Sequence, residues 1–237
     1  MSNTSTPKRG AGAGAGAGTK ARVMLVDDHP IVRQGLANLI DAESDLVVCA
    51  QVESADEAMR VLPDEKPDVV VVDISLGDRS GLELVKDIRA RWPDMPMLVL
   101  SMHDELLYAE RALRAGAKGY IMKQEATEKV MEGIRKVLDG ELYVSERMAA
   151  RLMDQAVNAK PAGTNPLSRL SDRELEVFTM IGHGLGTREI ANKLILSIKT
   201  VEAHREHIKE KLSLRSGTEL MRYAVQYTLQ EAPGTKT

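Results

Sequence analysis

The chain has 237 residues, of which 43% are hydrophobic and 28% are charged. This length suits two modest domains that each bury a core, and this composition excludes disordered and fibrous proteins. The net charge of -3 is small, and no apolar run approaches the length of a membrane span, so no membrane partner is expected.

The chain begins with a tail of residues 1–20 that contains the repeat GAGAGAGAG. We expect this tail to be flexible, because it lacks the apolar core of a targeting signal, and we expect the protein to stay in the cytoplasm. The single cysteine, Cys49, lies in the apolar run LVVCAQV and is interpreted as a core residue.

Residues 21–140 alternate short apolar segments with amphipathic stretches, as parallel βα units do. The predicted strands are residues 23–26, 46–52, 69–72, 97–100 and 119–122, and the predicted helices are residues 30–41, 55–62, 82–92, 106–115 and 127–139. Five such units predict an α/β fold, a flavodoxin-like (βα)5 doubly wound parallel sheet with both faces covered.

After residue 140 the pattern is helical only. A helical segment over residues 145–157 is followed by NAKPAGTNP, which predicts a hinge, and then by four helices. Ser171 with Glu174 and Ser216 with Glu219 have capping-box spacing, and Thr187 and Ser197 stand where N-caps are expected. We therefore expect an α/β domain over residues 21–140, a linker over 141–166, a small all-α domain over 167–230 and a tail over 231–237.

The two domains differ in charge. Residues 22–140 hold 15 Lys and Arg against 23 Asp and Glu, a net charge of -8, whereas residues 166–229 hold 10 against 8, a net charge of +2. The first domain is thus suited to hold cations, and the second would bind phosphate only weakly by charge alone.

Polar residues follow the predicted strands at their carboxyl ends, where doubly wound sheets bind ligands. In chain order they are Asp27 and Asp28, then Asp73, then Ser101, then Lys123. Each alone is more simply a turn, cap or surface residue. Their convergence on one edge of the sheet favours a common site.

Three carboxylates at one edge repel one another, so the site is expected to bind a hard cation such as Mg²⁺. Such a cation together with Lys123 would neutralise the oxygens of a phosphoryl group. A carboxylate there can act as nucleophile and form an aspartyl phosphate. Asp73 is the best candidate, because its strand, in DVVVVD, is the most apolar and is predicted to be central.

The segments VMLVDDHPIVRQGL, PDVVVVDISLGDRSGLELV, MPMLVLSMHDE and RALRAGAKGYIMK resemble the receiver domain of two-component response regulators. The resemblance implies that Asp73 is the phosphoacceptor and that Asp28 and Asp73, beside Asp27, bind Mg²⁺ with the backbone carbonyl of Ser75. It also implies that Ser101 and Lys123 contact the phosphoryl group and that Tyr120 moves inward on activation.

Two positions depart from the receiver pattern. Receivers commonly have proline after Leu76 and after the pocket lysine, where this chain has Gly77 and Gln124. The glycine is expected to loosen the loop after Asp73, and the glutamine removes an expected cis-proline. Neither change touches the acceptor chemistry.

The segment LSDRELEVFTMIGHGLGTREIANKLILSIKTVEAHREHIKEKL resembles the LuxR-type helix-turn-helix, and with the receiver it resembles NarL/FixJ-type response regulators. Independently, residues 187–194 and 197–212 form two amphipathic helices around a two-residue break, as a helix-turn-helix requires. A helical bundle that binds only protein remains the simpler alternative.

The second of these helices has nearly balanced charge, but position on the helix matters more than the sum. At 100° per residue, Val201, Ile208 and Leu212 face the core. The side chains expected near double-stranded DNA are Lys199, Thr200, Glu202, Ala203, Arg205 and Glu206, with Lys209 on phosphate. Glutamate accepts a hydrogen bond from cytosine in the major groove, so acid on this face can read sequence; pairing with lysine is the alternative for Glu206 and Glu210.

These observations predict a transcription regulator, not an enzyme apart from phosphorylation and dephosphorylation of its own Asp73. The expected partners are a sensor histidine kinase and double-stranded DNA, with a second copy of the chain in a phosphorylated homodimer and RNA polymerase as a further candidate. A phospho-dependent protein-binding module is the first rival. An aspartate-nucleophile phosphatase is the second, but it needs an aspartate two residues after the nucleophile, where this chain has Ser75.

Overall fold

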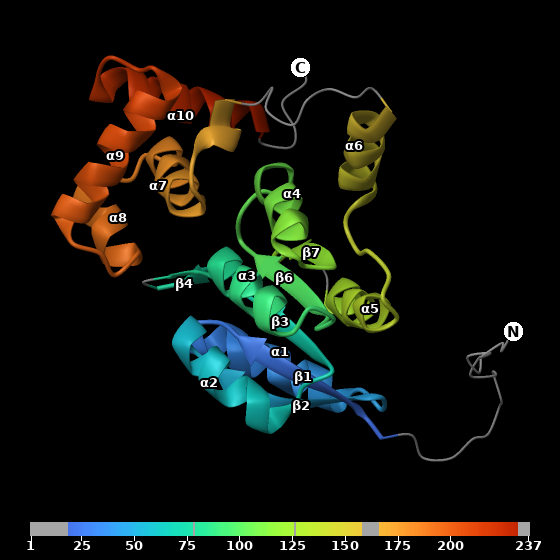
Figure 1. Ribbon diagram of the computed structural model, residues 1–237. Helices are drawn as coiled ribbons and strands as arrows, with labels where there is room; N and C mark the ends of the chain where they lie inside the picture. The colour runs from blue at the N-terminus through green and yellow to red at the C-terminus, as the bar shows by residue number, and fades with distance from the viewer. Residues whose placement is uncertain (1–18, 78, 126, 158–165, 232–237) are drawn as a thin grey trace, which may run out of the picture.

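The structure is a computed structural model, and it describes residues 19–77, 79–125, 127–157 and 166–231. A parallel sheet and its helices form the N-terminal half, and helices alone form the C-terminal half (Figure 1). Residues 158–165 of the predicted hinge, residues 1–18 of the first predicted tail and residues 232–237 of the second lie outside the described residues. Within the described residues, no helix has the length and apolar character needed to cross a membrane.

All five predicted strands are present and parallel. They are β1 (Ala21–Val26), β2 (Leu46–Val52), β3 (Val69–Val72), β6 (Met97–Ser101) and β7 (Gly119–Met122), in the order β2-β1-β3-β6-β7. The prediction that the strand before Asp73 is central is confirmed, because β3 has two strands on each side. Continuous apolar runs form these strands because both faces are buried.

Five helices cover the two faces of the sheet. They are α1 (Pro30–Ala42), α2 (Ala55–Glu65), α3 (Gly81–Arg91), α4 (Glu105–Ala115) and α5 (Thr127–Leu138). Alternate β3 residues separate the two cores: Val70 and Val72 pack with α2, α3 and α4, whereas Val69 and Val71 pack with α1 and α5. Cys49 of β2 is only half-buried, at the edge of the sheet, so its prediction as a core residue is met in part.

A short antiparallel hairpin after Asp73 was not predicted. It pairs β4 (Ser75–Leu76) with β5 (Arg79–Ser80). The expectation that Gly77 loosens this loop stays a prediction; the structure shows that Gly77 adopts φ +64° in the turn of the hairpin. Proline cannot adopt this conformation, since its ring holds φ near about -65°.

The C-terminal half consists of the helices α7 (Asp172–Gly182), α8 (Thr187–Lys193), α9 (Ile198–Leu212) and α10 (Gly217–Glu231), preceded by the linker helix α6 (Glu146–Val157) and the 3-10 turn η1 (Pro166–Arg169). The capping box of Ser171 and Glu174 and the cap at Ser197 are confirmed. Gly186, not Thr187, is the N-cap of α8, because its extended backbone precedes the first helical residue. The break before α9 covers residues 194–197, so it is longer than predicted.

The last helix, α10, buries the face that carries Leu220 and Ala224 in the core of the C-terminal half, where both residues are fully buried. Tyr223 and Tyr227 meet the ring of Phe178 at centroid distances of 5.8 and 6.1 Å. This apolar stripe of α10 therefore belongs to the core of the C-terminal half. The exposed apolar face of α10 instead carries Met221 and Leu229, beside a shallow groove.

Close packing of α7 against α10 predicts the effect of one substitution. A methyl group on Gly182 would lie 2.7 Å from the carbonyl oxygen of Ala224 and 2.1 Å from Thr228 Oγ1. We expect Gly182→Ala to lower the free energy of unfolding by about 1–3 kcal/mol, because the backbone of α10 must move. Urea denaturation followed by circular dichroism measures this change.

The matched control is Gly35→Ala in α1, where no described atom lies within 4 Å of the added methyl group. Alanine has the higher helix propensity, so this variant should be more stable by about 0.5–1 kcal/mol. Equal stability of Gly182→Ala and the unmodified protein would contradict the close approach of α7 and α10.

Candidate functional site

Three carboxylates meet at the carboxyl edge of the sheet, as predicted. Asp27 and Asp28 follow β1 and Asp73 follows β3, which is the neighbouring strand. Asp27 is only 6% exposed and Asp73 only 3%. Buried carboxylates of this kind require a compensating cation or proton.

Lys123 supplies one compensating charge from the end of β7. Its Nζ lies 2.6 Å from Asp27 Oδ2 and 2.7 Å from Asp73 Oδ2, and its side chain is 7% exposed. Burial opposes the charge of this ammonium group, but Asp73 and Asp27 raise its pKa above the usual range. The predicted convergence of Asp27, Asp73 and Lys123 on one site is therefore confirmed in the structure.

Burial raises the pKa of Asp73 to about 6, while the positive charge of Lys123 acts to lower it and the negative charge of Asp27 acts to raise it. Burial is the larger effect here, so Asp73 holds a proton more readily than an exposed aspartate. At neutral pH the carboxylate is mostly ionised, which is the form that acts as a nucleophile.

His29 joins this group, although it was not predicted. Its Nδ1 lies 2.6 Å from Asp28 Oδ1, and its backbone N–H donates to Asp27 Oδ1 at 2.8 Å. Possible ligand atoms of Asp27, Asp28, His29 and Asp73 all lie within 4.8 Å of one another. The three carboxylates fit a hard divalent cation, because such ions prefer oxygen ligands. The position of His29 directly after the aspartate pair was the available signal.

Ser101 and Tyr120, which were predicted to contact the phosphoryl group and to move on activation, both contact His103 in the loop after β6. Ser101 is fully buried, and its Oγ accepts a hydrogen bond from the His103 N–H at 3.1 Å. The Tyr120 hydroxyl donates to the His103 carbonyl at 2.8 Å. Tyr120 is buried in this structure, and its movement on activation stays a prediction.

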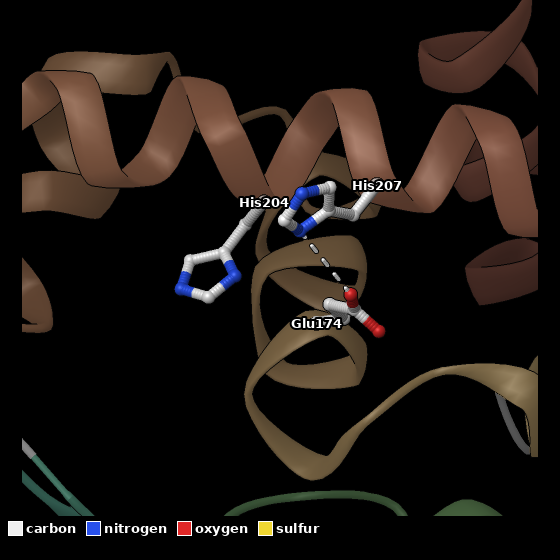
Figure 2. Close-up of side chains that lie close together, drawn as sticks. All are labelled: Glu174, His204 and His207. Carbon is white, nitrogen blue, oxygen red and sulfur yellow. Dashed lines mark ion pairs between the residues drawn. The ribbon is translucent and has the colours of Figure 1, made fainter.

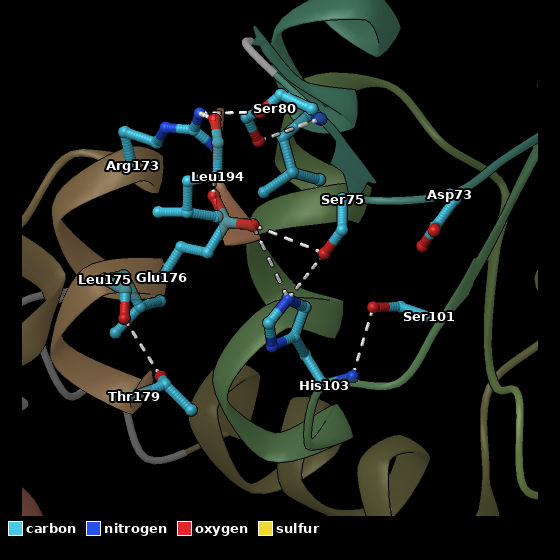
Figure 3. A network of polar contacts seen from close by, with 12 residues as sticks. Asp73, Ser75, Ser80, Ser101, His103, Arg173, Leu175, Glu176, Thr179 and Leu194 are labelled. Carbon is cyan, nitrogen blue, oxygen red and sulfur yellow. Dashed lines mark hydrogen bonds and ion pairs between the residues drawn. The ribbon is translucent and has the colours of Figure 1, made fainter. Parts of the chain in front are cut away.

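A polar network continues from His103 to the C-terminal half (Figure 3). His103 Nε2 lies 3.1 Å from Ser75 Oγ, and Ser75 Oγ donates to Glu176 Oε1 of α7 at 3.3 Å. Ser75 was predicted to bind metal through its carbonyl; its side chain contacts the second domain. The sequence offered no sign of this contact apart from Glu176 in the apolar run LEVF.

Both ionisable ends of this network are buried. Glu176 is 1% exposed, and burial raises the pKa of its carboxyl although Arg173 pairs with it at 2.7 Å and opposes the rise. Burial lowers the pKa of His103 to about 4, so its imidazole is neutral at physiological pH. The ring stacks on Tyr108 of α4 with centroids 4.5 Å apart.

The hairpin after Asp73 touches the helix-turn-helix directly. Arg173 Nη2 donates to the Gly77 carbonyl at 2.6 Å and to the Leu194 carbonyl at 3.0 Å. A methyl group on Gly77 would lie 3.2 Å from Cδ1 of Ile195, which stands in the turn before α9. One arginine thus joins the hairpin to the turn that precedes α9.

A second group of contacts holds α7 against α3 and α4. Arg111 donates to the carbonyls of Leu170 and Leu167 at 2.8 and 2.6 Å and pairs with Asp172 at 3.0 Å. Lys86 of α3 pairs with the other oxygen of Asp172 at 2.7 Å. These contacts were not predicted, since each side chain on its own resembles a solvated surface charge.

The expected division of α9 into an inner and an outer face is confirmed by burial. Val201 and Ile208 are fully buried, and Leu212 packs against the same core. The outer residues Lys199, Glu202, Ala203 and Glu206 are exposed, and Thr200, Arg205 and Lys209 are half-buried beside them. Glu206 pairs with Lys209 at 2.8 Å, which realises the alternative considered for this glutamate.

Comparison with known proteins agrees with both halves of this description. The family of response regulator receiver domains matches residues 23–135, and the family of bacterial regulatory proteins of the luxR type matches residues 168–224. The oxygen regulatory protein NreC of Staphylococcus haemolyticus is 38% identical over 213 residues, covering 88% of this chain and 98% of its own length.

Two solved structures are similar as well. A LuxR-family two-component response regulator from Aurantimonas is 34% identical with a TM-score of 0.55, covering 59% of this chain and 99% of its own. RcsB of Salmonella enterica bound to the promoter rprA with the phosphomimetic BeF3- is 25% identical with a TM-score of 0.58, covering 87% of this chain and 99% of its own. The chain belongs to the NarL/FixJ-type response regulators, in which a receiver domain is followed by a LuxR-type DNA-binding domain.

Proposed function

We propose that a sensor histidine kinase phosphorylates Asp73 and that the phosphorylated chain binds operator DNA through α9, in the cytoplasm. The observation that carries this proposal is the Lys123 ammonium group between the buried carboxylates of Asp27 and Asp73. In the transfer, an Asp73 carboxylate oxygen forms a bond to phosphorus. The bond from phosphorus to the kinase histidine breaks, and its electron pair leaves with the imidazole.

The chain's own residues account for the other requirements of this reaction. Asp27, Asp28 and Asp73, with the Ser75 carbonyl, would hold Mg²⁺, which when bound neutralises charge on the phosphoryl oxygens. Lys123 is placed to pair with the phosphoryl group, because it already contacts the acceptor carboxylate at 2.7 Å. Burial of Asp73 excludes water from the acceptor.

The network from Ser101 to Glu176 supplies a route to the second domain. A phosphoryl group on Asp73 would draw the Ser101 hydroxyl toward its oxygens, and this hydroxyl now accepts a hydrogen bond from His103. Movement of His103 would disturb Ser75 and Glu176, which hold α7 on the receiver. Release of α7 would also free the turn before α9 from the hairpin at Gly77.

The DNA contacts proposed are Lys199, Thr200, Glu202, Ala203, Arg205 and Glu206 toward the major groove, with Lys209 on phosphate. Their exposure or half-burial on one face of α9 supports this assignment. The small charge of the DNA-binding domain favours a homodimer, since two half-sites double the phosphate contacts. Met221 and Leu229 on the exposed face of α10 are suited to that contact, and RNA polymerase is a further proposed partner.

The switch predicts a difference between phosphorylated protein and a variant that lacks the acceptor. Phosphorylated wild type should bind an operator fragment at least about tenfold more tightly than Asp73→Ala, equivalent to about 1.4 kcal/mol, with two chains per site. Fluorescence anisotropy and analytical ultracentrifugation measure affinity and stoichiometry. Equal affinity and stoichiometry for the two proteins would refute the switch.

Removal of the contacts between the receiver and α7 should allow DNA binding without phosphorylation of Asp73. Adding Arg111→Ala to Asp73→Ala deletes the contacts to Leu167, Leu170 and Asp172, so DNA binding should rise toward that of phosphorylated protein. Arg114→Ala is the matched control on the same helix, because Arg114 pairs with Glu110 one turn away. Equal effects of the two arginine substitutions would count against docking as the restraint.

Base reading and phosphate contact predict different mutant phenotypes. Glu202→Ala should relax preference at one base pair by about 1–3 kcal/mol, because a base loses its acceptor. Lys209→Ala should weaken all sequences alike and reduce the salt slope by about one. Glu210→Ala is the control and should leave preference unchanged. Affinities of the three variants for a library of operator sequences measure these effects. A uniform loss of affinity for Glu202→Ala would exclude a role of Glu202 in base reading.

The raised pKa of Asp73 predicts that protons compete with Mg²⁺. The carboxyl is mostly ionised above its pKa of about 6 and protonated below it, so Mg²⁺ affinity should weaken as pH falls through that value. Titration calorimetry between about pH 8 and about pH 5.5 should show a total loss of about fourfold, because about three quarters of Asp73 is protonated half a unit below its pKa. Asp73→Asn should remove this dependence. An unmodified protein with constant affinity over the whole range would show that Asp73 does not bind the ion.

A further inference from the structure

A second set of metal-ligating side chains lies in the DNA-binding domain, far from the acidic pocket in sequence. Glu174 of α7 faces His204 and His207 of α9, and one possible ligand atom from each lies within 4.8 Å of the other two (Figure 2). His207 Nδ1 is 3.8 Å from Glu174 Oε1. We propose that these residues form a binding site for Zn²⁺ or a similar transition-metal ion.

The position of the histidines on α9 supports this site. His204 and His207 are three residues apart, so they project from the same side of the helix on successive turns. Their flank lies between the buried face of Val201 and Ile208 and the outer face that carries Glu202 and Glu206. A metal ion there would leave Glu202 and Glu206 uncovered, and among the proposed DNA contacts only Thr200 shares the histidine flank.

The third ligand is held in place before any ion binds. Glu174 is buried and belongs to the capping box of α7: its Oε2 accepts from the Ser171 N–H at 2.7 Å and from Lys211 Nζ at 2.6 Å. These contacts fix the carboxylate and direct Oε1 toward His207. Hydrogen bonds of this kind orient the ligands in known metal sites.

The chemistry of the three ligands selects the class of ion. Two imidazole nitrogens and one carboxylate oxygen suit Zn²⁺ and its neighbours rather than Mg²⁺ or Ca²⁺, and they leave a fourth position for water. Ligands around tetrahedral zinc lie about 3.3 Å apart, given bonds of about 2.0–2.2 Å. His207 is 57% exposed, so its ring can rotate to close the remaining distance.

Positive charges near Glu174 limit the affinity of the site for a metal ion. Glu174 already serves as a cap and pairs with Lys211, so the ion would bind beside an ammonium group that repels it. Arg173 precedes Glu174 and adds positive charge nearby. We therefore expect a site of moderate affinity that responds to the supply of free metal, rather than a permanent structural ion.

The site would join the first helix of the DNA-binding domain to its DNA-reading helix. Three ligands from α7 and α9 would restrict the tilt of α9 on α7, because an ion that bridges two helices removes relative freedom. Metal binding would thus stabilise the domain and change operator affinity independently of Asp73. Glu174, His204 and His207 lie outside the proposed phosphorylation site, so failure of zinc to bind would leave the phosphorylation proposal intact.

The test uses the full chain, Zn²⁺ as the probe, and excess Mg²⁺ to occupy the acidic pocket. Competition with a chromophoric chelator should show one Zn²⁺ per chain that His204→Gln and His207→Gln each weaken at least tenfold. His183→Gln is the matched control, since this exposed histidine at the end of α7 lies outside the cluster. Co²⁺ in place of Zn²⁺ should give visible absorption typical of tetrahedral coordination, which is lost in the same two variants.

Thermal unfolding supplies a second measurement. Zn²⁺ should raise the melting temperature of wild type and of His183→Gln but not of His207→Gln, because only an intact site binds the folded state. His207 is largely exposed, so its replacement should leave the fold intact without metal. Absence of Zn²⁺ binding by the wild type, or equal binding by all variants, would overturn the proposal.

Discussion

The Lys123 ion bridge is the interaction on which the receiver site depends. Two buried carboxylates, Asp27 and Asp73, share one ammonium group at 2.6 and 2.7 Å, and the sheet holds all three at one edge. Burial raises the pKa of Asp73 in spite of this cation, so the pocket does not fully stabilise the negative charge that it contains. A bound metal ion would stabilise the negative charge of such an acceptor. After phosphorylation, Lys123 could pair with the phosphoryl group instead of the carboxylate. Because negative charge exceeds positive charge in the pocket, binding of a cation or a change in the charge of Asp73 alters the electrostatic energy of the pocket strongly.

The contact between the two domains is polar where it is nearest to that pocket. Ser75, His103 and Glu176 form a buried chain, whereas Arg111 and Lys86 hold α7 through ion pairs and carbonyl contacts. Buried polar networks are costly when one member is displaced, since each remaining group loses a partner. A small shift of Ser101 or His103 therefore has a larger effect on docking than the loss of one apolar contact would have. This arrangement suits a restraint that phosphorylation can remove.

Much of the fold and half of the site could be predicted from the sequence. Apolar runs determine the five strands, and the polar residue after each strand determines the edge at which Asp27, Asp73 and Lys123 meet. These features are local or follow from one topological rule. The same holds for α9, where helical period alone separates Val201 and Ile208 from the outer residues. The roles of Tyr120 and of the Ser75 carbonyl came only from resemblance.

The contacts between domains could not be predicted, because they join residues whose partners lie far away in the chain. In the sequence, Arg111 and Asp172 resemble solvated surface charges, because their partners lie in the other domain. Glu176 is a charged residue within an apolar run, and the run itself gives no reason for it. Gly77 is the most informative case. It stands where receivers commonly have proline, and its positive φ, which proline cannot adopt, lies in the turn of the hairpin that Arg173 of the second domain contacts. A residue that departs from the receiver pattern thus supplies a carbonyl group for the contact between the domains. Departures from a family pattern near an active site are best interpreted together with the domain that packs against them.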